Sequence, residues 1–328
     1  MDIDATPFFH NCDIECKVDR SLWAKRIGIN PKALMDAKFM AEYPFDLNLH
    51  KTQNGIMQYL DVGAGNPVVM VHGNPTWSFF YRNVIKALQN NHRCIVPDHV
   101  GCGLSEKSDE FIDYTLEDHI DDLESLLENI LPPEGERGGA FDLIVHDWGG
   151  TIGLGYALRH PKRLRSLVVL NTSAFKDGDM PFLIKLSRNP LLGSFLVRGL
   201  NLFCLGGVWF TTMKRMPRAV KKGFVLPYTD YTNRAAVYGF VRDIPLSRSG
   251  PTWDLLSTID DGLKELLSDV PMLIQWGTKD WCFTPEFLKL WQTRFPGTET
   301  NKYNAGHYLL EDAGEKIIER IRGFLAKK

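Results

Sequence analysis

The 328-residue sequence lacks an excess of charge of either sign and any apolar run long enough to span a bilayer. Lys and Arg number 38 against 40 Asp and Glu, so the formal net charge of −2 gives no global field that would attract nucleic acid or an anionic membrane surface. The first five residues, Met1-Asp-Ile-Asp-Ala, lack the apolar core of a signal peptide. We therefore expect a cytoplasmic protein with no membrane span and no nucleic-acid partner.

The sequence also lacks the usual signatures of metal and dinucleotide sites. No two of its six cysteines form a CxxC pair, and Cys12 and Cys16 have no His or second Cys pair nearby to complete a zinc site. Gly101 and Gly103 do not make a dinucleotide fingerprint, because the third glycine and the strand–helix–strand context are missing. The sequence therefore predicts neither a metal ion nor a cofactor.

What the sequence does contain is a strand, a sharp turn and a helix around Asp147. The apolar run Phe141 to Val145 has the length and flanks of a buried parallel strand. It ends at Asp147-Trp148, and Gly149-Gly150 then leads into a predicted helix from Thr151 to His160. This layout is typical of a nucleophile elbow, in which one side chain stands on a strained turn above a sheet. The nucleophile position holds Asp rather than Ser.

Similar strand–helix units recur along most of the chain. They indicate an α/β fold with a mostly parallel central sheet and helices on both faces. We assign residues 44–174 and 249–328 to this core. Between them, in residues 175–248, the alternation stops and bulky apolar residues become frequent, which predicts an inserted helical cap. Residues 1–43 form an N-terminal arm with predicted helices at Arg20–Ile27 and Pro31–Met40, expected to pack on the body or on a partner.

Candidate site residues stand where predicted strands end. In open α/β sheets, sites form beyond the carboxyl ends of the strands. Asn74, Asp147, Asn171, Asp280 and His307 all occupy such positions. We expect these side chains to lie close together in the fold.

Three of these residues form a candidate catalytic set. Asp147, Asp280 and His307 follow the chain order nucleophile, acid, histidine of the α/β-hydrolases. A carboxylate nucleophile can attack carbon to give an ester intermediate. His307 suits the base that opens such an ester with water, and Asp280 would orient its imidazole. We therefore predict that Asp147, Asp280 and His307 are catalytic.

Two further residues are candidate donors to an oxyanion or leaving group. Trp148 follows the nucleophile, so its backbone N–H is the expected oxyanion donor, and its indole N–H is a second donor. Asn74 lies in the loop that supplies the other half of such a hole and brings a side-chain amide.

Several motifs together resemble the haloalkane dehalogenase branch of the α/β-hydrolases. They are His72-Gly-Asn-Pro-Thr-Trp, the loop Asp98 to Ser105, Val145-His-Asp-Trp-Gly-Gly and Asn304-Ala-Gly-His-Tyr. Within that branch, four segments are most similar to the β-lactone decarboxylases of bacterial long-chain olefin biosynthesis: Asn171-Thr-Ser-Ala-Phe, Asp243-Ile-Pro-Leu, Gly277-Thr-Lys-Asp-Trp-Cys-Phe and Gly306-His-Tyr-Leu-Leu-Glu-Asp. The resemblance covers about residues 44–325.

The resemblance implies a function and a set of partners. The first expectation is decarboxylation of cis-3,4-dialkyl β-lactones to cis-alkenes and carbon dioxide, on a small apolar substrate. It also implies assembly with other enzymes of olefin biosynthesis. In the dehalogenases, residues matching Asn74 and Trp148 hold the departing halide, and the same donors could hold a lactone oxygen.

Other interpretations of the same sequence stay open. Hydrolytic dehalogenation of haloalkanes is the main alternative, and Asn171 argues only against the subgroup that carries its catalytic acid at that position. Epoxide hydrolysis would need two tyrosines from the cap, for which Tyr228, Tyr231 and Tyr238 are available. A catalytically dead binding protein is disfavoured by the complete set of Asp147, Asp280 and His307. We interpret Asp98 and His99 as residues that shape the site and His146 as a packing residue.

Overall fold

The computed structural model describes residues 18–177, 182–245 and 247–327. The first 17 residues of the predicted arm, with Cys12 and Cys16, lie outside these ranges. Residues 178–181 and 246 of the predicted cap also lie outside them.

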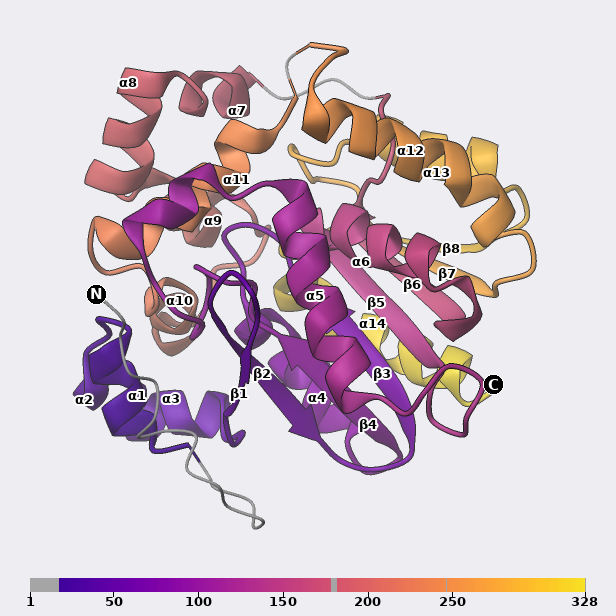
Figure 1. Cartoon of the computed structure of the whole chain (residues 1–328), viewed down its shortest axis with the longest axis horizontal. Helices are drawn as coiled ribbons and strands as arrows, with labels where there is room; N and C mark the ends of the chain where they lie inside the picture. The colour runs from indigo at the N-terminus through magenta and orange to yellow at the C-terminus, as the bar shows by residue number, and fades with distance from the viewer. Residues whose placement is uncertain (1–17, 178–181, 246, 328) are drawn as a thin grey trace.

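One eight-stranded sheet runs through the described chain (Figure 1). Its order is β1-β2-β4-β3-β5-β6-β7-β8. Strand β2 pairs antiparallel with β1 and with β4, and all the other neighbours are parallel. The strands are β1 (Asn48–Lys51), β2 (Ile56–Val62), β3 (Asn66–Val71), β4 (His92–Pro97), β5 (Phe141–Asp147), β6 (Leu164–Thr172), β7 (Met272–Gly277) and β8 (Glu299–Tyr303). The predicted, mostly parallel sheet is confirmed.

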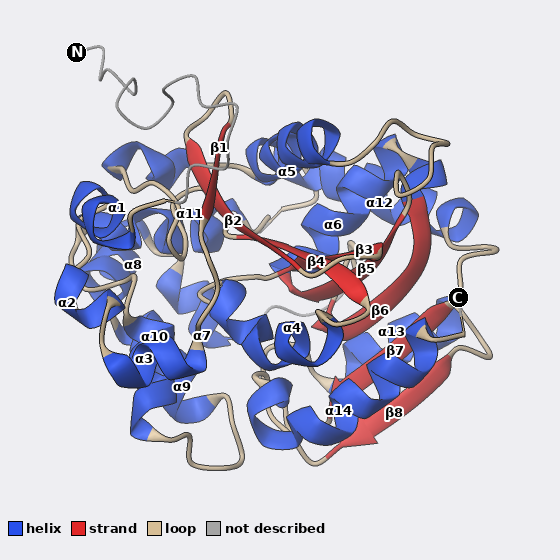
Figure 2. Cartoon of the chain, turned by 90° about the horizontal axis from the view of Figure 1, so that it is seen from below, coloured by secondary structure: helices blue, strands red, loops and turns tan. Residues whose placement is uncertain are grey.

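Helices cover both faces of this sheet (Figure 2). Alternate residues of β3 show why: Val68 and Met70 belong to one apolar core, and Val69 and Val71 belong to the other. Both faces of the strand are therefore buried, as a parallel strand requires. On one face lie α5 (Leu116–Ile130), α6 (Trp148–Arg159) and α12 (Pro251–Leu266), with α13 (Pro285–Arg294) packed into the same core; on the other lie α4 (Arg82–Leu88) and α14 (Leu309–Leu325).

The start of α5 illustrates how the sequence defines an element. The backbone N–H of Asp118 donates to Thr115 Oγ1, and the backbone N–H of Thr115 donates to Asp118 Oδ2 at 2.9 Å. This reciprocal capping box satisfies two backbone donors that the first helical turn leaves free. Below it, Leu116, Ile120 and Leu123 point into the core at helical spacing.

The described part of the N-terminal arm packs on the body. It consists of α1 (Arg20–Arg26), α2 (Pro31–Leu34) and α3 (Ala37–Glu42). The prediction of one helix from Pro31 to Met40 is wrong, because the side chain of Asp36 accepts hydrogen bonds from Lys38 N and Phe39 N and so starts a new helix. Trp23 is fully buried, and its indole N–H donates to the carbonyl oxygen of Leu104 at 2.8 Å.

The segment between β6 and α12 contains helices and no strand in its described residues. In Figure 1 these helices gather to the left of the sheet, above the N-terminal helices. They are α7 (Phe182–Ser187), α8 (Pro190–Ser194), the π-helical turn η5 (Phe195–Gly199), α9 (Leu202–Phe210), α10 (Arg218–Val225) and α11 (Ala235–Asp243). Within the described residues the short 3₁₀ turns are η2 (Ser78–Tyr81), η3 (Asp109–Asp113), η4 (Pro161–Arg163) and η6 (Thr232–Arg234). We keep the name cap for α7 to α11.

Within the described residues, no individual helix combines the length and the apolar character needed to cross a bilayer. The helical stretches Leu192–Gly199 and Leu202–Phe210 reach that length and apolarity only together, and a bend of 65° separates them.

The junction of β5 and α6 provides a stability test of the fold. A Cβ atom on Gly149 would lie 2.1 Å from the backbone carbonyl oxygen of Val71. Gly149→Ala should therefore lower the free energy of unfolding by about 1–3 kcal/mol, as overpacking of a core does. Gly323→Ala is the matched control, since no atom lies within 4 Å of its added Cβ, and it should raise stability by about 0.5–1 kcal/mol. Equal urea midpoints for the two variants would contradict the close approach of α6 to β3.

Candidate active site

Asp147 stands at the turn between β5 and α6, in a backbone conformation that non-glycine residues seldom adopt. Its φ and ψ are 54° and −131°. Such conformations cost on the order of 1–3 kcal/mol and persist where surrounding contacts enforce them. Here the hydroxyl of Thr172, on the neighbouring β6, donates to the Asp147 carbonyl oxygen. The side chain, 10% exposed, lines a cavity rather than the core.

The carboxylate of Asp147 has two fixed neighbours. The backbone N–H of Asn74 donates to Oδ1 at 2.6 Å. The Nε2 atom of His307 lies 3.5 Å from Oδ2. The loops after β3, β5 and β8 therefore meet at one point, as expected for the carboxyl ends of parallel strands.

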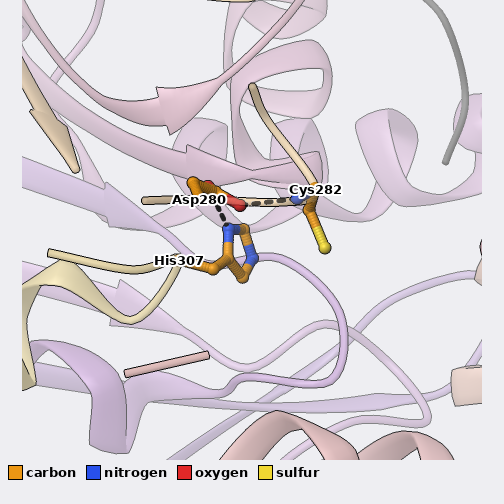
Figure 3. A group of neighbouring side chains, drawn as sticks. All are labelled: Asp280, Cys282 and His307. Carbon is orange, nitrogen blue, oxygen red and sulfur yellow. Dashed lines mark hydrogen bonds and ion pairs between the residues drawn. The ribbon is translucent and has the colours of Figure 1, made fainter. Parts of the chain in front are cut away.

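His307 is in turn held by Asp280, which follows β7. Its Nδ1 lies 2.8 Å from Asp280 Oδ2 (Figure 3). The side-chain amide of Asn171 donates to the same Asp280 oxygen at 2.7 Å, and the backbone N–H of Cys282 donates to the other oxygen at 2.7 Å. The structure thus brings together Asp147, His307 and Asp280.

The supporting roles of Asn171, Cys282 and Phe283 were not predicted. Asn171 ties the ends of β6 and β7 together, because its amide oxygen also accepts the backbone N–H of Gly277 at 2.7 Å. The Phe283 ring stacks on His307 with centroids 5.7 Å apart. One local signal was available, since an Asp in a turn commonly accepts backbone N–H groups two and three residues on. Cys282 and Phe283 hold those positions after Asp280.

The electrostatics of the three residues depend on one imidazole between two carboxylates. Burial opposes charge on His307, but Asp280 and Asp147 outweigh it and raise the pKa of His307 to about 10. Burial likewise disfavours the Asp147 carboxylate, yet the hydrogen bond and charge of His307 bring its pKa below the ordinary value. At neutral pH the resting site therefore holds an ionised Asp147 and an imidazolium.

Asp280, Cys282 and His307 place three ligand-type atoms within 4.8 Å of one another, which is close enough for a metal ion. They do not fit one well. His307 Nδ1 is engaged with Asp280, and the raised pKa of His307 keeps that nitrogen protonated. Burial raises the pKa of the Cys282 thiol well above its usual value, so it is a neutral thiol rather than a thiolate ligand. The cluster is better explained as an acid–histidine pair.

The two predicted donors differ in what they contact. The side-chain amide of Asn74 donates to the carbonyl oxygen of Val237 in α11, at 3.0 Å, which links the loop after β3 to the cap. The Asn74 backbone N–H is the group aimed at Asp147. Trp148 lines the cavity and its ring packs against Phe240 at 5.4 Å. Within the described part of the chain its indole N–H has no hydrogen-bond acceptor.

A cavity of about 950 Å³ lies over these groups, between the sheet and the cap. Its wall is mainly apolar, and among its lining residues are Phe175, Ile184, Leu196, Phe203, Val241, Trp253, Leu256 and Phe287. Tyr228, Tyr231 and Tyr238 do not line it, so the pair of cap tyrosines that epoxide opening needs is not at the site. The space suits an apolar ligand.

Asp98, His99 and His146 form hydrogen bonds that hold the loops around the site. Asp98 is fully buried and accepts the backbone N–H groups of Ser78 and Leu104, each at 2.7 Å. His99 makes two hydrogen bonds with His72, one through its backbone N–H and one through its Nε2. His146 donates to the carbonyl oxygen of His307 at 3.0 Å, and burial lowers the pKa of His146 to about 3, so it stays neutral.

The raised pKa of His307 predicts a pH dependence of stability. A group whose pKa is higher in the folded than in the unfolded state contributes stability that is complete below its unfolded value, about 6.5. That contribution is lost as pH rises to about 10. The free energy of unfolding of the wild type should therefore fall more steeply between pH 7 and 10 than that of His307→Gln, by up to about 1.4 kcal/mol per pH unit. Parallel slopes in urea titrations at pH 7, 8.5 and 10 would show that His307 is not the imidazolium described here.

Comparisons with known proteins agree with this geometry. The family model of the alpha/beta hydrolase fold matches residues 66–314. A solved structure of a putative ancestral haloalkane dehalogenase superposes with a TM-score of 0.75, covering 86% of this chain and 99% of that one at 24% sequence identity. At that identity the likeness establishes the fold, which is the predicted α/β-hydrolase fold.

Proteins with similar sequences identify a narrower family within this fold. A cis-3-alkyl-4-alkyloxetan-2-one decarboxylase of Shewanella oneidensis is 42% identical over 87% of this chain and 89% of its own length. Another, from Xanthomonas campestris, is 40% identical over 83% of this chain and 92% of its own. Haloalkane dehalogenase 2 of Mycobacterium bovis is 29% identical over 85% of this chain and 94% of its own length. The chain therefore belongs to the α/β-hydrolase fold family and, within it, to the family of the cis-3-alkyl-4-alkyloxetan-2-one decarboxylases.

Proposed function

We propose that this chain converts cis-3-alkyl-4-alkyloxetan-2-ones, which are dialkyl β-lactones, to cis-alkenes and carbon dioxide, with Asp147 as the nucleophile. The observation that carries the proposal is an apolar cavity of about 950 Å³ with an ionised carboxylate at its wall. The 42% and 40% identity to decarboxylases, against 29% to a dehalogenase, favours this substrate over a haloalkane.

The proposed reaction needs no water. One oxygen of Asp147 attacks the ring carbon that carries the 4-alkyl group, and the bond from that carbon to the ring oxygen breaks. This gives an alkyl ester of Asp147 and frees the carboxylate of the substrate. The bond between that carboxylate and the neighbouring carbon then breaks, and its electron pair forms the alkene. Asp147 leaves as a carboxylate, so carbon dioxide and alkene account for every atom of the lactone.

The surrounding residues support both steps electrostatically. The imidazolium of His307 keeps Asp147 ionised before attack and favours its return as a leaving carboxylate, since both states place negative charge 3.5 Å from Nε2. The indole N–H of Trp148 is the proposed donor for the ring oxygen as it gains charge, whereas the backbone N–H of Asn74 donates to Asp147 Oδ1 and so positions the nucleophile. Asp280 orients His307 and maintains its charge.

Haloalkane hydrolysis is the second candidate, because the same donors can hold a halide and a dehalogenase relative covers most of the chain. That reaction needs His307 as a base toward water. Esterification of Asp147 removes one of the two charges that raise the pKa of His307, so the imidazole can lose its proton at that stage. The resting site is therefore compatible with both reactions, and the products must distinguish them. A role in olefin biosynthesis, assembly with its other enzymes and a cytoplasmic location stay predictions from the sequence.

Parallel product assays test the proposed function. Purified enzyme is incubated with a cis-dialkyl β-lactone and with 1-bromobutane or a longer bromoalkane, and alkene and bromide are measured. We expect alkene formation to be at least tenfold faster than bromide release. Asp147→Asn removes the nucleophilic charge at nearly constant size and should reduce either activity by several orders of magnitude. Bromide release that exceeds alkene formation tenfold would make the enzyme a dehalogenase, and full activity of Asp147→Asn would remove the nucleophile from the scheme.

The apolar cavity predicts a preference for long alkyl arms. Each methylene buried on binding contributes about 0.8 kcal/mol, which corresponds to roughly a fourfold gain in kcat/KM. A series of β-lactones with lengthening arms should therefore show rising kcat/KM until the cavity is filled. The measurement is the kcat/KM of each lactone under identical conditions. A flat series would indicate that the alkyl arms stay outside the cavity.

A further inference from the structure

The mouth of the cavity is formed by apolar side chains that face solvent. Five large apolar residues both line the cavity and are exposed, namely Leu186, Leu202, Leu205, Trp209 and Phe210, and the exposed Asp177 also lines it. Phe210 is 75% and Trp209 56% exposed, which is unusual for such large apolar side chains. Met213, 54% exposed, extends this surface just beyond α9. We call these six apolar residues the apolar rim.

The segment that carries this rim contains basic residues but no acidic ones; an acidic side chain from another segment lies nearby, since Asp312 of α14 accepts the backbone N–H groups of Met213 and Lys214. Between Asp179 and Asp230 the sequence contains eight Lys and Arg residues and no Asp or Glu, although the net charge of the whole chain is −2. Arg215, Arg218 and Lys222 are exposed, and none of them forms an ion pair with a carboxylate in the described ranges. The global balance of charge thus conceals a local basic surface.

The basic side chains lie directly beside the apolar rim. The ammonium of Lys221 stands 3.1 Å from the centroid of the Trp209 ring. Burial and the nearby charge of Arg215 lower the pKa of Lys221, which places Arg215 in the same group. Helix α10 buries Val220 and Phe224 and turns Lys222 outward, so its polar face is basic.

From this juxtaposition we propose that the cap docks on the surface of an anionic lipid bilayer, with the apolar rim inserted at the headgroup level and the basic residues on the phosphates. An apolar face with Trp, Phe and Leu beside Lys and Arg is the combination that holds helices in a membrane interface.

Docking of the cap on a bilayer would also affect how the substrate reaches the cavity. This inference rests on the β-lactone decarboxylation proposed above. The rim is the entrance of the cavity, so docking would open the site toward the phase in which a dialkyl β-lactone dissolves. A long-chain substrate could then enter, and an alkene leave, without crossing water. The charge complementarity favours anionic lipid over another protein of unspecified charge, since each Lys or Arg near such a surface adds to binding.

Sedimentation with sucrose-loaded vesicles tests the docking without substrate, so its result is independent of the proposed activity. The full chain is mixed with vesicles of phosphatidylcholine alone or with 30% phosphatidylglycerol added, and the bound fraction is measured. We expect binding to the anionic vesicles that weakens as salt is raised. Arg215→Gln with Lys222→Gln should weaken it by about 10- to 30-fold. Lys316→Gln with Arg320→Gln removes two exposed charges from α14 and should leave it unchanged.

Two further double variants test whether the apolar rim contributes to vesicle binding. Phe210→Ser with Met213→Ser should reduce binding about tenfold or more. Leu22→Ser with Met35→Ser changes two similarly exposed side chains in the N-terminal arm and should have no effect. Circular dichroism establishes that each variant is folded. The proposal is overturned if the wild type stays in the supernatant with both vesicles, if both members of a pair behave alike, or if gel filtration shows that Phe210 and Met213 join two copies that bind no lipid.

Discussion

The site depends on a single imidazolium placed between two buried carboxylates. His307 lies 2.8 Å from Asp280 and 3.5 Å from Asp147, and without its charge two nearby buried anions would oppose each other. The fold supplies this arrangement because β5, β7 and β8 end at one edge of a parallel sheet. Asn171 and the turn at Cys282 then hold Asp280 from both sides. The strained backbone of Asp147 is tolerated because Thr172 donates a hydrogen bond to its carbonyl oxygen and Asn74 donates one to its carboxylate.

Much of this was accessible from the sequence, because the signals are local. A buried run that stops at Asp147 before two glycines specifies a turn, and a Cβ on Gly149 or Gly150 would meet other atoms at 2.1 or 2.0 Å. Apolar runs without alternation predicted parallel strands buried on both faces, and the two cores confirm them. The order Asp147, Asp280, His307 predicted which residues meet, although their roles in catalysis stay predictions. The family resemblance supplied the substrate class, which residue patterns alone left open between lactone, haloalkane and epoxide.

What the sequence could not predict depends on contacts between distant segments. The amide of Asn74 was expected to face the ligand, yet it donates to the carbonyl oxygen of Val237 in the cap, 163 positions away. Asn171 was predicted to lie close to the other candidate residues, but its contact with Asp280 and its bridge between the ends of β6 and β7 were not predicted. The helix predicted from Pro31 to Met40 divides at Asp36, because a strong capping side chain outweighs a continuous helical pattern.

The net charge of the chain was also a poor guide to the charge of one part of its surface. A formal net charge of −2 correctly describes the whole molecule and excludes a global field, but electrostatic recognition at short range depends on local arrangement. Between Asp179 and Asp230 the chain carries eight cations and no anion, beside the exposed side chains of Trp209 and Phe210. An apolar cavity needs an entrance that an apolar ligand can reach, and a rim that is itself apolar provides one at the cost of exposing that surface to water. Covering the rim with lipid would remove that cost at the moment the substrate is delivered.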